Sequence, residues 1–193
     1  RAAKLFLEST GVKGGVEIQL IKRIPVAAGL AGGSKDAAAV FKGMNILYKT
    51  GLTEEALKEL GVKIGADVPY CIMGGTALAE GRGEVLTDLA PLPDCAIVLC
   101  KPEFGIPTPS LFARLDGHAP SRRPDVDGMM DALAAGDLPG VAARLGNVFE
   151  EVLPEEYREV FAIKCRLMAH GAMNAAMSGS GPTVFGLFAE EET

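Results

Sequence analysis

The sequence predicts an α+β protein with two halves. Strand-like and helical segments follow in the order strand, helix, helix, hairpin, and then strand, several helices, hairpin, which is irregular enough to favour α+β. Pro91-Leu92-Pro93 lies between the two series and is typical of a linker, so we place one domain at 1–92 and another at 93–193. Because 48% of the 193 residues are hydrophobic, a proper core can form.

The longest helix of the first half is predicted over 34–49, where apolar residues recur at helical spacing. Ser34 is a good N-cap for it, and Gly51 is the glycine expected beyond its end. Thr53 is expected to cap the next helix. The other expected elements are a helix up to Ser9, a strand Val16–Ile24, a short helix after Asp67, and strands Thr76–Glu80 and Glu84–Leu89 around Gly81-Arg82-Gly83.

The second half is expected to begin with a buried strand, because Cys95–Cys100 is a continuous apolar run. Most of 107–169 has helical patterning. The expected helices are Pro109–Leu115, Asp127–Ala134, Leu138–Val148 and Glu155–His170, and the expected closing strands are Ala175–Met177 and Thr183–Ala189 around the glycine-rich turn Ser178–Pro182.

A glycine-rich turn between the expected strand and the helix at 34–49 predicts a phosphate site. Gly29, Gly32 and Gly33 let backbone N–H groups approach a ligand, and a helix N-terminus adds partial positive charge. Asp36 in the first turn would repel a phosphate, so we expect a cation or a lysine between them. The Walker and dinucleotide-binding patterns are both absent. The alternative is a plain helix start after a tight turn.

Composition narrows the partners. A net charge of −6 without a basic run argues against nucleic acid. No stretch has the length of a membrane-spanning helix and no signal peptide is visible, so we expect no membrane partner. The four cysteines lack metal-ligand spacing and are typical of reduced thiols in a cytoplasmic protein.

Two further features fit phosphoryl transfer, which needs an anion cradle and a group that orients or deprotonates the attacking hydroxyl. Asp67 suits the second role, with a simple N-cap as the alternative. The turn at 178–183 would line the site, with a tight hairpin as the alternative.

At these features the chain resembles the GHMP kinases, a superfamily of small-molecule kinases. Pro25–Ala39 is similar to their phosphate-binding motif. Gly65–Pro69, Gly75–Glu84, Ile106–Pro109 and Met177–Thr183 together narrow the resemblance to the branch of 4-diphosphocytidyl-2-C-methyl-D-erythritol kinases. The similarity runs from about residue 17 to 188.

The resemblance implies a two-domain fold, with an N-terminal half (here incomplete) like domain 2 of ribosomal protein S5 and a ferredoxin-like C-terminal half. It implies that ATP and Mg²⁺ are used to phosphorylate the 2-hydroxyl of the cytidine diphosphate-linked methylerythritol. Another GHMP small-molecule kinase and a non-catalytic degenerate module are the alternatives. Ile106–Pro109 disfavours the former, and intact Asp67 and Ser34 disfavour the latter.

The resemblance also implies roles for individual residues. Asp67 would be the catalytic carboxylate, and Ser34 would lie near the phosphates and Mg²⁺. Phe112 would stack on the cytosine, with a core phenylalanine as the alternative. The implied ATP-binding residues are Pro25, Ala27, Ala28, Gly29, Leu30, Ala31, Gly32, Gly33, Ser34 and Lys35, and the implied substrate-binding residues are Thr108, Phe112, Ser178, Gly179, Ser180 and Gly181.

Two departures from the family pattern stand out. Lys35 occupies a position where the family usually has a small hydroxyl residue, and it would contact phosphate, pair with Asp36 or crowd the site. The family's N-terminal segment, with a lysine that partners the catalytic aspartate, is not in this sequence, and the C-terminal end is abrupt. We therefore expect a fragment that binds ATP weakly and turns over slowly, if at all.

Overall fold

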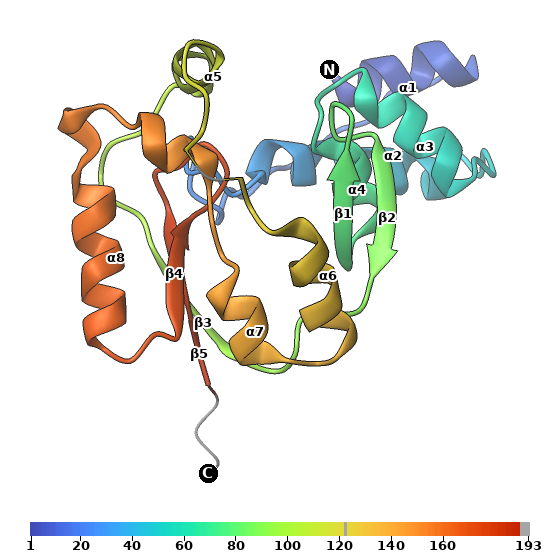
Figure 1. The fold of residues 1–193 in the computed structure, drawn as a ribbon. Coiled ribbons are helices and arrows are strands. Elements are labelled where there is room, and N and C mark those ends of the chain that lie inside the picture. Colours follow the sequence, from blue (N-terminus) through green and yellow to red (C-terminus); the bar gives the residue numbers. More distant parts are fainter. Residues whose placement is uncertain (122, 190–193) are drawn as a thin grey trace. The chain divides into compact units, whose positions relative to one another are not determined.

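The computed structural model describes residues 1–121 and 123–189. Two compact units form (Figure 1), one from Arg1–Ile24 and Ala31–Leu89, the other from Pro25–Leu30 and Ala90–Thr193. The segment Pro25–Leu30 therefore packs with the second unit, although both its chain neighbours belong to the first. Within the described ranges, no helix has the length and apolar character needed to cross a membrane.

The first unit consists of helices around one core and a two-stranded hairpin. Its elements are α1 (Ala2–Thr10), α2 (Gly32–Leu47), α3 (Glu54–Val62), α4 (Val68–Met73), β1 (Thr76–Glu80) and β2 (Val85–Leu89). Phe6 of α1, Phe41 of α2 and Ile72 of α4 are fully buried in the core that these helices share. The strands pair antiparallel, with Thr76 opposite Leu89, as the Gly81–Gly83 turn predicts.

The ends of two helices test the predicted caps. Thr53 caps α3 as predicted, because its side chain accepts a hydrogen bond from the Ala56 amide at 3.2 Å. The cap predicted for Ser34 is wrong: α2 already begins at Gly32, after Ala31 in a left-handed conformation, and no side chain caps it. The predicted end is also wrong, since α2 stops at Leu47 and Lys49 takes the first left-handed φ, +51°.

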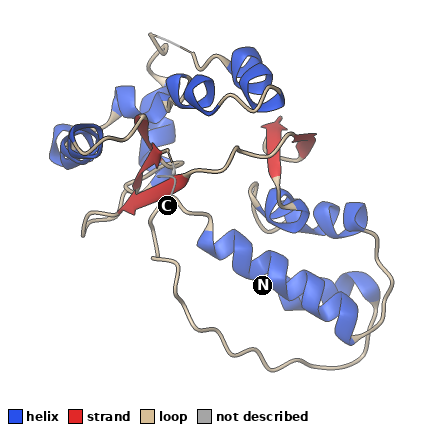
Figure 2. Cartoon of the chain, turned by 90° about the horizontal axis from the view of Figure 1, so that it is seen from below, coloured by secondary structure: helices blue, strands red, loops and turns tan. Residues whose placement is uncertain are grey.

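The strand predicted at Val16–Ile24 does not form. The chain from residue 11 to 31 is irregular (Figure 2), and Ile18 and Leu20 are about half exposed, at 50% and 56%. A strand needs a neighbour to pair its backbone N–H and C=O groups, and within the described ranges no strand pairs with this segment. An apolar sequence alone therefore does not produce a strand here.

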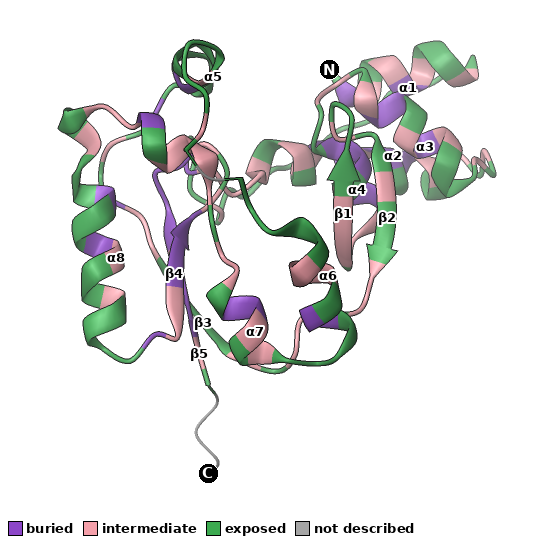
Figure 3. Cartoon of the chain, in the orientation of Figure 1, coloured by how far each residue is buried: buried purple, intermediate pink, exposed green. Residues whose placement is uncertain are grey.

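The second unit contains an antiparallel sheet in the order β3-β5-β4, from strands Ala96–Cys100 (β3), Asn174–Met177 (β4) and Val184–Phe188 (β5). Helix α8 (Glu159–Ala169) packs on β4 and β5, and Val160, Met177 and Val184 form the buried contact. Most of β4 is buried (Figure 3). The remaining elements are α5 (Thr108–Asp116), α6 (Val126–Ala134), α7 (Leu138–Ala143) and the 3₁₀ helices η1 (Val148–Val152) and η2 (Glu155–Tyr157).

Three predictions for this unit need correction. The strand predicted as buried at Cys95–Cys100 is an edge strand, because β5 is its one partner within the described ranges, and its Ile97 and Leu99 side chains are more than half exposed. The helix predicted over Leu138–Val148 ends at Ala143, and a 3₁₀ helix follows. The helix predicted from Glu155 begins with a 3₁₀ turn, so α8 itself starts at Glu159.

Candidate functional site

The two glycine-rich segments singled out in the sequence lie in direct contact within the second unit. The Ser178 hydroxyl donates a hydrogen bond to the Gly29 carbonyl at 2.9 Å. The Thr183 amide donates to the Ala28 carbonyl at 3.3 Å. The turn at 178–183 joins β4 and β5, so it is the hairpin that the sequence offered as the alternative to a binding loop. The same turn also contacts the segment Pro25–Leu30.

Glycine is required at the point of contact. Gly29 has a φ of +72°, and a Cβ there would collide with the Ser178 carbonyl oxygen. Gly181 has a φ of +73°, and its Cβ would collide with the Met177 sulfur. Gly29 meets backbone atoms of the other segment, so glycine is needed there for the close approach of the two segments, whereas the contact at Gly181 is with the Met177 side chain of its own segment.

A buried hydroxyl lies beside this contact. Thr183 is fully buried, and its Oγ1 has no hydrogen-bond partner among the described residues. An unpaired buried hydroxyl costs about 1–3 kcal/mol, a penalty that native proteins rarely carry away from functional sites.

Two of the predicted substrate residues lie next to the hairpin turn. The hydroxyls of Thr108 and Ser180 are hydrogen-bonded at 2.7 Å. Phe112, one turn further along α5, is 52% exposed and meets Phe149 edge-on, with ring centroids 4.9 Å apart. Phe112 is therefore not a core phenylalanine, and about half of its surface is open to solvent.

In the first unit, the N-terminus of α2 has no side-chain cap. The amides of its first turn therefore have no intrahelical acceptor and remain available to a ligand. Asp36 pairs with Lys22, whose Nζ lies 2.6 Å from the carboxylate. Lys35 is exposed and forms no ion pair with Asp36 among the described residues.

Asp67 has the position of an N-cap and does not act as one. It immediately precedes α4, yet its side chain forms no capping hydrogen bond and is exposed. The hairpin turn secures the chain here, because a Cβ on Gly83 would lie 2.8 Å from the Ala66 carbonyl oxygen. The carboxylate is therefore held on a supported turn and is not used by the fold.

Asp67 and Lys35 share a neighbourhood within the first unit. Burial raises the pKa of the Cys71 thiol above its ordinary value, the Lys35 ammonium opposes that rise, and the Asp67 carboxylate adds to it. Cys71 lies one turn after Asp67, and its amide donates to the Asp67 carbonyl at 3.0 Å. The charges of Lys35 and Asp67 thus act on one thiol.

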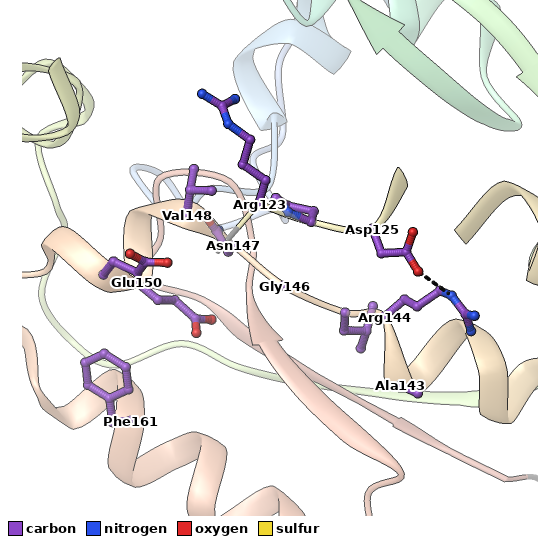
Figure 4. A pocket seen from close by; sticks show the side chains of 12 residues that line it. Arg123, Asp125, Ala143, Arg144, Gly146, Asn147, Val148, Glu150 and Phe161 are labelled. Atoms are coloured by element: carbon purple, nitrogen blue, oxygen red, sulfur yellow. Dashed lines mark hydrogen bonds and ion pairs between the residues drawn. The ribbon is translucent and has the colours of Figure 1, made fainter. Parts of the chain in front are cut away.

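Asn147 and Glu150, which no sequence pattern singled out, hold the hairpin turn. The side-chain Nδ2 of Asn147 donates to the carbonyls of Met177 and Gly179, and the Glu150 carboxylate accepts from the backbone amide of Met177. Both residues line a cavity of about 600 Å³ in the second unit (Figure 4), in which Arg144 pairs with Asp125 at 3.0 Å. Their partners are about 30 residues away in sequence, so local spacing gave no signal for them.

Comparison with known proteins decides the family. The N-terminal domain model of the GHMP kinases matches residues 1–75, and their C-terminal model matches residues 129–193. A 4-diphosphocytidyl-2-C-methyl-D-erythritol kinase of Lachnospira eligens is 47% identical over 193 residues, which is 100% of this chain and 67% of that protein. The chain belongs to the GHMP kinase family.

Other members of the GHMP kinase family give the same picture. The kinase of that name from Lachnoclostridium phytofermentans is 48% identical over 97% of this chain, which spans 64% of that protein. A solved 4-(cytidine 5'-diphospho)-2C-methyl-D-erythritol kinase aligns with a TM-score of 0.78 and 36% identity, covering 96% of this chain and 66% of that one. A homoserine kinase from Cytophaga hutchinsonii shares the fold, with a TM-score of 0.80 at 21% identity over 98% of this chain and 65% of that one.

Proposed function

We propose that this protein transfers the γ-phosphoryl group of ATP to the 2-hydroxyl of 4-diphosphocytidyl-2-C-methyl-D-erythritol. One observation carries the proposal: the chain is 48% and 47% identical, over almost its whole length, to kinases named for this substrate. The segment Ile106–Pro109, which resembles that branch, disfavours the other GHMP kinases.

The uncapped start of α2 supports the ATP end of the proposal. The free amides there, in a first turn that begins with Gly32 and Gly33, suit the β- and γ-phosphates, and Lys35 adds an exposed positive charge. Mg²⁺ usually binds through one or two protein oxygens and the substrate phosphates. The Ser34 hydroxyl suits that role, because Asp36 is already paired with Lys22 and no cluster of three metal-ligating side chains occurs within 1–121 and 123–189. When bound, Mg²⁺ would neutralise phosphate charge.

Asp67 is assigned to the hydroxyl that reacts. Its carboxylate would accept the proton as the substrate oxygen attacks the γ-phosphorus and the bond from that phosphorus to the ADP oxygen breaks. The exposed carboxylate without a capping bond supports this role. Phe112 would stack on the cytosine, while Thr108 and the turn Ser178–Gly181 would bind the rest of the substrate.

A coupled ADP-release assay tests the proposal on the protein expressed from its complete reading frame. We expect turnover with the cytidyl substrate and none with homoserine or mevalonate; the opposite preference would assign another member of the family. Asp67→Asn should abolish turnover and retain ATP binding. Unchanged turnover in that variant would remove Asp67 from the reaction, and no turnover with any of the three substrates would favour a non-catalytic module.

The proposal extends to the location of the protein. Cys71, Cys100 and Cys165 are free thiols. Scattered free thiols are typical of cytoplasmic proteins, so we place the enzyme in the cytoplasm.

A further inference from the structure

All the polar atoms of the Asn147 side chain form hydrogen bonds with backbone groups. Its Nδ2 donates to the carbonyls of Met177 at 2.8 Å and Gly179 at 2.7 Å, and its Oδ1 accepts from the Phe149 amide at 3.0 Å. A carboxamide has only two N–H donors, so both are committed to the hairpin turn Ser178–Pro182 and the strand residue before it. Nothing in its geometry indicates contact with a ligand.

Glu150 holds the same strand end from the next turn of η1. Its Oε1 accepts from the Met177 amide at 2.7 Å, while its Oε2 pairs with Lys164 of α8. The Glu150 side chain is only 13% exposed, which strengthens both interactions. Met177 is therefore fixed at its amide by Glu150 and at its carbonyl by Asn147, immediately before the turn begins.

The position of the turn also determines where the proposed binding residues lie, because two of its serines bond them. Ser178 donates to the Gly29 carbonyl, and Ser180 is bonded to Thr108. Gly179 itself packs on Gly29, since a Cβ on Gly179 would lie 3.2 Å from the Gly29 carbonyl oxygen. A displaced Gly179 carbonyl would therefore move both contacts, because the packing leaves no free space.

We propose that Asn147 is a positioning residue, which sets the backbone of Ser178–Pro182 and through it Gly29 and Ser180. The expected effect of this role on catalysis rests on the proposed function, whereas its expected effect on the structure of the turn does not. Asn147 touches neither ATP nor substrate in this proposal and acts only through the two carbonyls that it holds.

The chain supplies a matched control at the opposite end of β4. Asn174 is also a partly buried asparagine of the second unit, and its Nδ2 donates to the Ala142 carbonyl at 2.7 Å. Its Oδ1 accepts from the Ala175 amide at 2.8 Å. Asn174→Ala therefore removes comparable hydrogen bonds without touching the hairpin turn, and it measures the general cost of losing a buried asparagine.

The test compares Asn147→Ala and Asn147→Asp with Asn174→Ala in the protein from its complete reading frame. Asn147→Asp keeps the size and the acceptor for Phe149 and removes both donors, so it remains informative if the alanine variant folds poorly. Hydrogen exchange at the amides of Ser178, Gly181 and Thr183 is measured first, because these amides donate within the turn and to Ala28. Substrate and ATP kinetics follow, well below the thermal midpoint of each variant.

We expect both Asn147 variants to exchange these amides about tenfold faster than Asn174→Ala, and to lose about tenfold or more in kcat/KM, as small misplacements of binding groups do. Equal exchange and kinetics in the Asn147 and Asn174 variants would overturn the positioning role. A wild-type protein without kinase activity, together with faster exchange in the Asn147 variants, would overturn the proposed function and support the positioning role.

Discussion

The Ser178 hydroxyl donates a hydrogen bond over 2.9 Å to the carbonyl of Gly29, a residue 149 positions earlier in the chain. The contact brings together two glycine-rich segments that local sequence could only describe separately. It also accounts for one glycine of each segment: Gly29 and Gly179 have positive φ angles, and a Cβ on either would crowd the backbone of the other segment. The two segments therefore form one packed, hydrogen-bonded contact, although they are far apart in the sequence.

Gly29→Ala should destabilise the protein. The new Cβ would collide with the Ser178 carbonyl oxygen on a backbone with φ of +72°, so we expect a loss of about 1–3 kcal/mol in the free energy of unfolding. Gly43→Ala in α2 is the control, because its Cβ meets nothing within 4 Å, and it should stabilise by about 0.5–1 kcal/mol. Urea denaturation measures both, and equal midpoints for Gly29→Ala and wild type would contradict the tight contact.

Asp67→Ala and Asp137→Ala should have opposite effects, although both residues precede a helix. The Asp137 side chain caps α7 by accepting from the Gly140 amide at 3.0 Å, so its loss should cost about 1 kcal/mol of stability and leave kcat unchanged. Asp67 makes no such bond, so its loss should leave stability within about 0.5 kcal/mol and lower kcat by about 100-fold or more. Thermal denaturation and ADP release distinguish the two variants. A loss of stability in Asp67→Ala without a loss of kcat would restore the capping role of Asp67.

The Cys71 thiol should report on its charged neighbours. Burial raises its pKa, so alkylation at pH 8 should be slower than at exposed Cys165, measured by mass spectrometry of the two peptides. Lys35→Gln removes a charge that lowers this pKa and should slow the reaction further, whereas Asp67→Asn should speed it. Equal rates in all three proteins would separate Cys71 from these charges.

The same pKa has a consequence for stability. The folded state holds the Cys71 proton more tightly than the unfolded state, whose thiol pKa is about 8.5. This contribution is present in full below that pH and is lost as the pH rises from there through the higher folded pKa. Cys71→Ser should therefore flatten the fall of the thermal midpoint between about pH 8 and pH 10.

The bond between Thr108 and Ser180 should be measurable by a double-mutant cycle. Thr108→Val, Ser180→Ala and the double variant should show a coupling energy of about 0.5–1 kcal/mol for the 2.7 Å contact. Ser110→Ala is the control, since Ser110 bonds only the Pro107 carbonyl in the same helical turn. Under the proposed function both Thr108 and Ser180 variants should raise KM for the cytidyl substrate, and additive effects on stability would show that the two hydroxyls do not interact.

Features with local causes could be predicted from the sequence. The Thr53 cap and the hairpin around Gly81–Gly83 depend on residues two to four positions apart, and both formed as expected. The strand expected at Val16–Ile24 depends on a pairing partner, which spacing cannot reveal, and it is absent. Ser34 lost the cap to a left-handed Ala31, a conformation that alanine rarely adopts and no propensity would suggest.

The site shows the same division. Gly29, Asp67 and Ser178 were predicted as site residues from two glycine-rich turns, an N-cap position and the resemblance to the GHMP kinases, and these roles stay predictions. Asn147 and Glu150 were not, because their importance lies in backbone atoms that they meet 30 and 27 residues later. Charge predicted a cation or a lysine between Asp36 and a bound phosphate, and the fold pairs Asp36 with Lys22, which no spacing indicated.

The assignment of Pro25–Leu30 to the second unit means that the polypeptide passes from one unit to the other and back before it leaves the first for good at Leu89. The bonds of this segment to Ser178 and Thr183 close a long loop, which slows their formation during folding. A proteolytic cut at the linker would separate this segment from the unit that it completes. The two units are therefore interleaved in the sequence, and a single cut between them cannot yield two intact halves.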